Sequence, residues 1–242
     1  MMRLGVIGGL GPMATAYFME LVIKMTKAEC DQDHLEMIIY NCPTIPDRTK
    51  YILGQSEESP LPRMLEVGQA LQQQGADVIA IPCMTAHYFR DALKENIGVR
   101  VIHGIRETAQ CLKDAGVTIA GIMATDGTIQ SEIFQKEIEA LGLIAVIPDA
   151  EHQAKVMKMI YEEIKAGKMP SKDEFMKVKQ HLIEGKGAQA VILGCTELSL
   201  IKNAYDLGNG VIDTLEVLAQ ASLLACEKEV LEEYQTLVVP IK

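Results

Sequence analysis

The chain has 242 residues, 23% of them charged and 48% hydrophobic, and 33 acidic residues outnumber 23 basic ones to give a net charge of −10. This acidic balance argues against nucleic acid or an anionic membrane surface as a partner, and no apolar run is long enough to span a bilayer. We therefore expect a soluble globular protein whose partner is a small molecule.

The cysteine pattern indicates a reducing compartment. The six cysteines are scattered, with neither a C-x-x-C pair nor a Cys/His spacing typical of zinc. The apolar start of the chain contains glycines and a proline that suit a strand, turn and helix better than a signal peptide. We expect a cytoplasmic protein without a bound metal.

Strand and helix signals alternate along the chain, which is typical of an α/β fold with parallel sheets. Strands are predicted over 3–7, 37–41, 78–81, 118–123, 143–147, 190–193 and 211–213. Helices are predicted over 12–26, 61–74, 84–95, 154–168, 175–184, 198–204 and 215–229. These elements fall into two halves of similar order.

One segment occurs twice. GADVIAIPCMT at 75–85 aligns without a gap with GAQAVILGCTE at 187–197, which places Cys83 on Cys195. Each copy is a buried strand followed by a cysteine at its carboxyl end, the end at which parallel sheets bind ligands. The two thiols are therefore expected to face each other across a cleft between two similar domains.

The repeat also predicts the domain division. We expect residues 1–103 together with 211–242 to form the first α/β domain and residues 104–210 to form the second. The helix over 215–229 follows the completed second half, so we expect it to cross back and pack on the first half.

Two glycine- or threonine-containing turns are candidate anion sites. Gly9-Leu10-Gly11 opens the first predicted helix and matches the dinucleotide pattern G-x-G-x-x-A, although that match alone is weak. Its backbone amides suit a phosphate or a carboxylate equally well. Thr125 and Thr128 occupy the corresponding turn of the second half, where their hydroxyls either cap a helix or assist in holding a carboxylate.

Arg48 and Lys165 are candidate cationic groups. Two prolines precede Arg48, so we expect it on a loop, either as a solvated surface residue or as a bidentate partner of a substrate carboxylate. Lys165 falls in the last turn of a predicted helix, where lysines commonly complement the helix dipole.

Three chemistries use thiols of this kind. A cysteine hydrolase requires one cysteine with a base and an orienting group, and it would leave the second cysteine without a role. A disulfide switch does not explain the anion-binding turns. Racemisation requires two similar acid/base groups on opposite faces of a carbon, which a repeated cysteine supplies. Cys83 also precedes a predicted helix, whose N-terminus favours a thiolate, and Glu197 is placed to influence Cys195 or a substrate ammonium.

Five motifs in order resemble the aspartate/glutamate racemase family: GGLGPMAT at 8–15, IPDR at 45–48, PCMTAH at 82–87, ATDGT at 124–128 and LGCTEL at 193–198. The resemblance covers nearly the whole chain. It implies two similar Rossmann-like domains related by pseudo-two-fold symmetry, a cofactor-independent reaction in the cleft between them, and a homodimer. It also implies a role for each candidate site residue. Cys83 and Cys195 would be the acid/base pair, Arg48 and Lys165 would hold substrate carboxylates, and the pocket would be lined by Met84, Thr85, Thr125, Thr128, Thr196 and Glu197.

One residue departs from the family pattern. Met84 stands where the family usually has asparagine after the first cysteine, and methionine cannot donate a hydrogen bond. This leaves the choice of amino acid open. The alternatives are a hydantoin- or maleate-type enzyme of the same fold and a non-catalytic amino-acid-binding module.

Overall fold

A computed structural model of the chain describes residues 2–241. It contains two four-stranded sheets, and every strand pairing within them is parallel. The first sheet has the order β2-β1-β3-β4 and the second the order β6-β5-β7-β8. The predicted α/β fold with two similar halves is therefore confirmed.

The strands of the first sheet are β1 (Leu4–Gly8), β2 (Met37–Asn41), β3 (Val78–Ala80) and β4 (Arg100–Val101). Those of the second are β5 (Ile119–Met123), β6 (Ile144–Val146), β7 (Ala190–Leu193) and β8 (Val211–Asp213). The central strands β1, β3 and β7 are buried along their whole length, as parallel strands covered on both faces should be.

The helices of the first half are α1 (Pro12–Met25), α2 (Arg48–Ile52), α3 (Leu61–Gln73) and α4 (Arg90–Asn96). The later helices are α5 (Gly104–Asp114), α6 (Asp126–Gln130), α7 (Ile133–Ala140), α8 (Ala150–Lys158), α9 (Lys172–Gln180), α10 (Ser199–Ala204) and α11 (Thr214–Ala225). None of the helices in residues 2–241 is long and apolar enough to cross a membrane.

Three predicted helices have irregular geometry. The segment after Cys83 begins as a 3-10 turn over Met84–Phe89 before α4. Helix α8 continues as a wider π-type turn over Met159–Glu163 that leads toward Lys165, and α9 continues as a similar turn over His181–Gly185. Sequence periodicity does not distinguish these turns from an α-helix, because each is only 5 or 6 residues long. The first two irregular segments lie next to predicted site residues.

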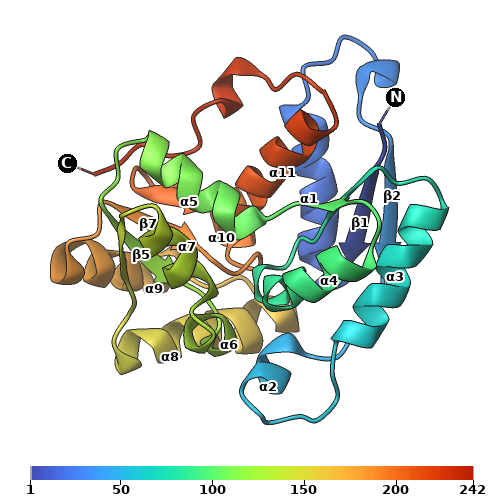
Figure 1. Cartoon of the computed structure of the whole chain (residues 1–242). Coiled ribbons are helices and arrows are strands. Elements are labelled where there is room, and N and C mark those ends of the chain that lie inside the picture. Colours follow the sequence, from blue (N-terminus) through green and yellow to red (C-terminus); the bar gives the residue numbers. More distant parts are fainter. Residues whose placement is uncertain (1, 242) are drawn as a thin grey trace.

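The end of the chain joins the two halves. Strand β8 pairs with β7 and so extends the second sheet, whereas α11 packs against α1 and α5 (Figure 1). Beyond α11, Val230 pairs with Thr26 of the first half, and the Ile241 amide donates to the Gln189 carbonyl of the second. The helix crosses back as expected. The division at residue 211 stays a prediction, since β8 belongs to the second sheet and the later residues contact both halves.

Gly9 fixes the turn between β1 and α1. Its φ is +90°, and a Cβ added there would lie 2.4 Å from the carbonyl carbon of Cys42. We expect Gly9→Ala to lower the free energy of unfolding by about 3 kcal/mol, because a left-handed conformation and a backbone clash are combined. Gly116→Ala is the control, since Gly116 has a φ of +75° with open space around it, and should cost only about 1 kcal/mol. Equal losses in denaturant unfolding would show that the contact with Cys42 is unimportant.

Candidate active site

A small cavity lies between the two halves at the carboxyl ends of β3 and β7. Its free volume is about 10 Å³, which is space for about one water molecule. It is lined by Leu10, Asp47, Arg48, Thr49, Cys83, Met84, Thr85, Thr125, Tyr161, Lys165, Cys195, Thr196 and Glu197. Nine of the ten predicted site residues are in this lining. The tenth, Thr128, lies just behind it, and its Oγ1 is hydrogen-bonded to Thr85 Oγ1 at 2.9 Å.

A larger vestibule adjoins this cavity. It has a volume of about 510 Å³ and shares Leu10, Asp47, Arg48, Lys165 and Glu197 with the inner cavity. The glycine-rich turn over residues 9–14 forms part of its wall. The shared residues therefore lie between the vestibule and the two thiols, and an amino acid reaching the thiols requires the inner cavity to widen.

The two cysteines are buried free thiols on the same cavity. Cys195 Sγ lies 2.9 Å from Glu197 Oε2 and donates its proton to that carboxylate. Burial raises the pKa of Cys195 well above its usual value, and the negative charge of Glu197 raises it further. Cys195 is therefore a protonated thiol at neutral pH, the form that can donate a proton.

The two preceding prolines suggested that Arg48 lies on a loop, and this prediction is wrong. Arg48 is the first residue of α2, which Asp47 caps through its side chain, and it is only 8% exposed. Its Nη2 donates to the Leu10 carbonyl at 2.7 Å and its Nη1 to the Pro46 carbonyl at 2.9 Å. Nε has no hydrogen-bond partner among the described residues. A surface role is thus excluded, and one N–H group of the guanidinium remains available to a ligand.

The electrostatic surroundings keep Arg48 charged. Burial by itself lowers the pKa of Arg48, but Cys83, Asp47 and Glu197 together outweigh that effect, and the net direction is upward. Cys83 lines the same cavity as the guanidinium. A fixed positive charge therefore stands beside the first cysteine.

Lys165 bridges two carboxylates at the mouth of the cavity. Its Nζ lies 3.9 Å from Glu197 Oε1 and 3.9 Å from Asp47 Oδ2, and 4.1 Å from the centre of the Tyr161 ring. The Tyr161 hydroxyl donates to Asp47 Oδ2 at 3.1 Å, which links the second half to the first. Asp47 and Tyr161 were not predicted as site residues. Their signals were their positions, beside Arg48 and one helical turn before Lys165.

Threonine hydroxyls also join the halves. Thr85 Oγ1 lies 3.1 Å from Thr125 Oγ1, and Thr49, a further residue that the sequence analysis missed, donates to Thr125 at 3.1 Å. Thr196 donates to the Pro82 carbonyl at 3.1 Å. Thr125 is at the same time the N-cap of α6, so capping and cavity lining are combined in one residue.

Two buried residues that follow Cys83, Met84 and His87, contribute less directly to the cavity. Met84 is 1% exposed, and its thioether end lies against Gly104 in the hydrophobic core, so its role as a substrate contact stays a prediction. His87 is buried, with Nε2 3.4 Å from the Ile81 carbonyl, and burial lowers its pKa to about 3. It is therefore neutral at physiological pH.

This arrangement can be compared with known proteins. A family model described as Asp/Glu/Hydantoin racemase matches residues 7–222. The chain belongs to this family. It is 32% identical to the Picrophilus torridus aspartate racemase, with a TM-score of 0.82 over 98% of this chain and 99% of that structure.

Two further relatives agree with this assignment. The chain is 28% identical over 227 residues to the broad-specificity amino-acid racemase RacX of Bacillus subtilis (strain 168), covering 91% of this chain and 96% of RacX. It is 25% identical to an aspartate racemase homologue from Pyrococcus horikoshii OT3, with a TM-score of 0.77 over 94% of this chain and all of that one. The family and these relatives support an amino-acid racemase.

Glu197→Gln should shift the pH dependence of turnover. Removing the carboxylate removes a charge that raises the pKa of Cys195, so its thiolate should form at lower pH. If Cys195 is the base for one enantiomer, the rise of kcat/KM with pH for that enantiomer should move to lower pH. In the opposite direction, activity should fall at lower pH than in the wild type. Identical profiles for variant and wild type, measured from both enantiomers, would contradict this coupling.

Proposed function

We propose that this protein racemises an acidic amino acid, aspartate or glutamate, without a cofactor, using Cys83 and Cys195 as the two acid/base groups. The observation that carries the proposal is that two buried thiols, each at the carboxyl end of the equivalent strand of a repeated half, line one cavity. The α-carbon would lie between them, with one sulfur on each face.

The proton transfers follow from this placement. For one enantiomer, Cys83 would take the α-proton and Cys195, which carries a proton directed at Glu197, would protonate the opposite face. The roles exchange for the other enantiomer. Electrons left at the α-carbon delocalise into the α-carboxylate, which must be stabilised by preorganised charges and amides in a site that excludes water. Two thiols supply both proton transfers, so no cofactor is needed.

Arg48 and Lys165 support the choice of an acidic substrate. The unpaired Arg48 Nε and the Lys165 ammonium both border the cavity, and each suits a carboxylate. Glu197 would meet the substrate ammonium. The names of the relatives include both aspartate and glutamate racemases as well as a broad-specificity enzyme, so neutral amino acids belong in the same assay. We expect a cytoplasmic homodimer.

The test is an assay of each enantiomer of aspartate and glutamate, with alanine and homoserine for comparison, by chiral chromatography. The protein should convert either enantiomer of one acidic amino acid to an equal mixture, with the same activity before and after treatment with a carbonyl reagent that inactivates pyridoxal phosphate. Turnover of neutral amino acids alone would refute the assignment to acidic substrates. Ligand binding without any turnover would favour a binding module.

A further inference from the structure

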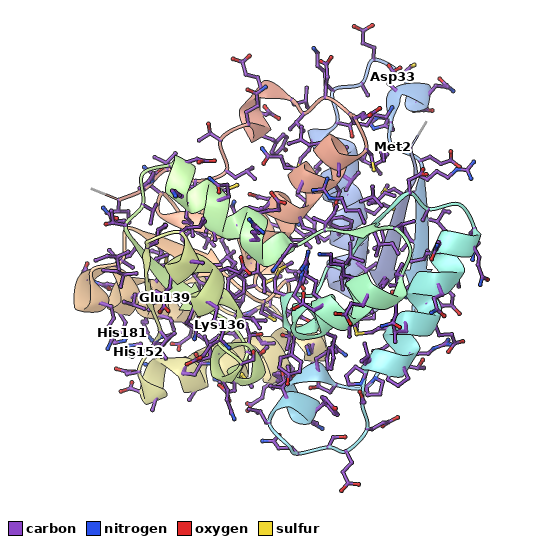
Figure 2. All side chains as sticks on the ribbon, viewed as in Figure 1. Met2, Asp33, Lys136, Glu139, His152 and His181 are labelled. Carbon is purple, nitrogen blue, oxygen red and sulfur yellow. The ribbon has the colours of Figure 1, made fainter. Side chains whose placement is uncertain are left out.

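A second cluster of reactive side chains lies outside the catalytic cavity. Asp149 caps α8, His152 occupies the first turn of that helix, and His181 begins the π-type turn that follows α9. Figure 2 shows both histidines together at the edge of the molecule. One ligand atom from each of the three residues lies within 4.8 Å of the others.

The contacts within the cluster bring its possible ligand atoms together. His152 Nδ1 lies 2.7 Å from Asp149 Oδ1. The Asp149 amide donates to His181 Nε2 at 3.3 Å, and Asp149 Oδ2 faces the same nitrogen at 3.6 Å. One carboxylate therefore faces a nitrogen of each imidazole, and an ion bound between the three side chains would replace these hydrogen bonds.

The three side chains are held close together. The imidazole rings of His152 and His181 stack with centroids 3.9 Å apart and planes 7° apart. The backbone amide of His152 donates to Asp149 Oδ1 at 2.9 Å, which fixes the carboxylate beside the two rings.

The cluster is open to solvent. It borders a depression of about 500 Å³ lined by His152, Lys155, Lys177, Gln180, His181, Glu184 and Gly185. The two lysines are each paired with a glutamate, Lys155 with Glu151 and Lys177 with Glu174, so their charges are partly compensated. A hydrated ion could enter without unfolding either helix.

We propose that Asp149, His152 and His181 bind one divalent transition-metal ion, with Zn²⁺ as the preferred ion and water completing the coordination. Two imidazoles and one carboxylate are a ligand set that zinc accepts, and the imidazole planes would turn from their stack to aim at the ion. The ion would join α8 to the end of α9. Helix α8 leads toward Lys165 and α9 leads to β7 and Cys195, so the site clips together two segments that build the catalytic cavity.

The test uses the full-length protein, freed of metal and then titrated with Co²⁺ and with Zn²⁺ against a chromophoric chelator. We expect one equivalent to bind and the affinity to fall about 100-fold or more in His181→Gln and in Asp149→Asn, since each removes a ligand. His34→Gln is the matched control, because His34 lies in the first half, and it should bind as the wild type does. Zn²⁺ should raise the unfolding temperature of the wild type and the control but not of the two ligand variants.

The thiols are the main competitors for the ion. Cobalt bound to a thiolate gives intense charge-transfer absorption, whereas two imidazoles and a carboxylate do not. A thiolate spectrum, binding that survives His181→Gln, or failure to bind at millimolar metal would each overturn the proposal and leave the cluster as a helix cap with stacked rings. Unfolding of the metal-free variants at the wild-type temperature verifies that they fold.

Discussion

Cys83→Ala and Cys195→Ala are each expected to lower kcat/KM for racemisation by about 10³-fold or more. Each substitution removes the acid/base group on one face of the α-carbon, and general acid–base catalysis contributes about 10²- to 10⁴-fold per group. Both side chains are buried at the cavity, where alanine fits without overpacking. The measurement is the initial rate from each pure enantiomer, with circular dichroism to verify the fold.

Cys111→Ala is the matched control for these variants. Cys111 is a half-buried thiol on α5 that does not line the cavity, so it should have no part in proton transfer. Its replacement should leave activity within about twofold of the wild type. Full activity in either Cys83→Ala or Cys195→Ala would remove that thiol from the mechanism and exclude a two-cysteine reaction.

Arg48→Lys is expected to lower kcat/KM for the acidic substrate by about 100-fold. Lysine keeps the charge, but it cannot both hold the Leu10 and Pro46 carbonyls and present a planar N–H group to a carboxylate. If Arg48 binds the side-chain carboxylate, the variant should discriminate less between aspartate and a neutral amino acid. The ratio of kcat/KM values for aspartate and alanine measures this directly.

The control for this change is Arg63→Lys. Arg63 pairs with Glu66 near the surface of α3, so its replacement should leave both kcat/KM values unchanged. An equal loss on aspartate and alanine in Arg48→Lys would mean that Arg48 serves only to hold the loop over residues 45–47. Unaltered kinetics on both substrates would remove Arg48 from the site.

The repeated cysteine segment was the most informative part of the sequence. The Gly-Ala pair, the buried strand and the terminal cysteine are local features, and their repetition predicted two similar sheets with both thiols at one cleft. Gly75 and Gly187 each adopt positive φ at the start of this segment, which explains why glycine occurs in both copies. The structure places the predicted residues around that cleft, while their roles in binding and catalysis stay predictions.

Other features depended on contacts between distant segments. The buried Arg48 side chain donates to the Leu10 carbonyl, and the Tyr161 hydroxyl donates to Asp47 in the other half. Both hydrogen bonds join residues that are far apart in the sequence, so neither follows from local spacing. Strand β4 and helices α5 and α7 were not predicted. Likewise, the pairing of β8 with β7 is a choice of sheet neighbour, which a three-residue strand does not specify by itself.

The most direct test of the central claim is incubation of the protein in D₂O with each pure enantiomer of aspartate and of glutamate, followed by NMR of the α-proton and analysis of product chirality. The two-cysteine mechanism predicts that the inverted product carries deuterium at the α-carbon from the first turnovers, while the remaining substrate retains its proton. Formation of the deuterated, inverted product should be lost in Cys83→Ala and in Cys195→Ala. Exchange with retention of configuration, or inversion that persists in either variant, would contradict the account.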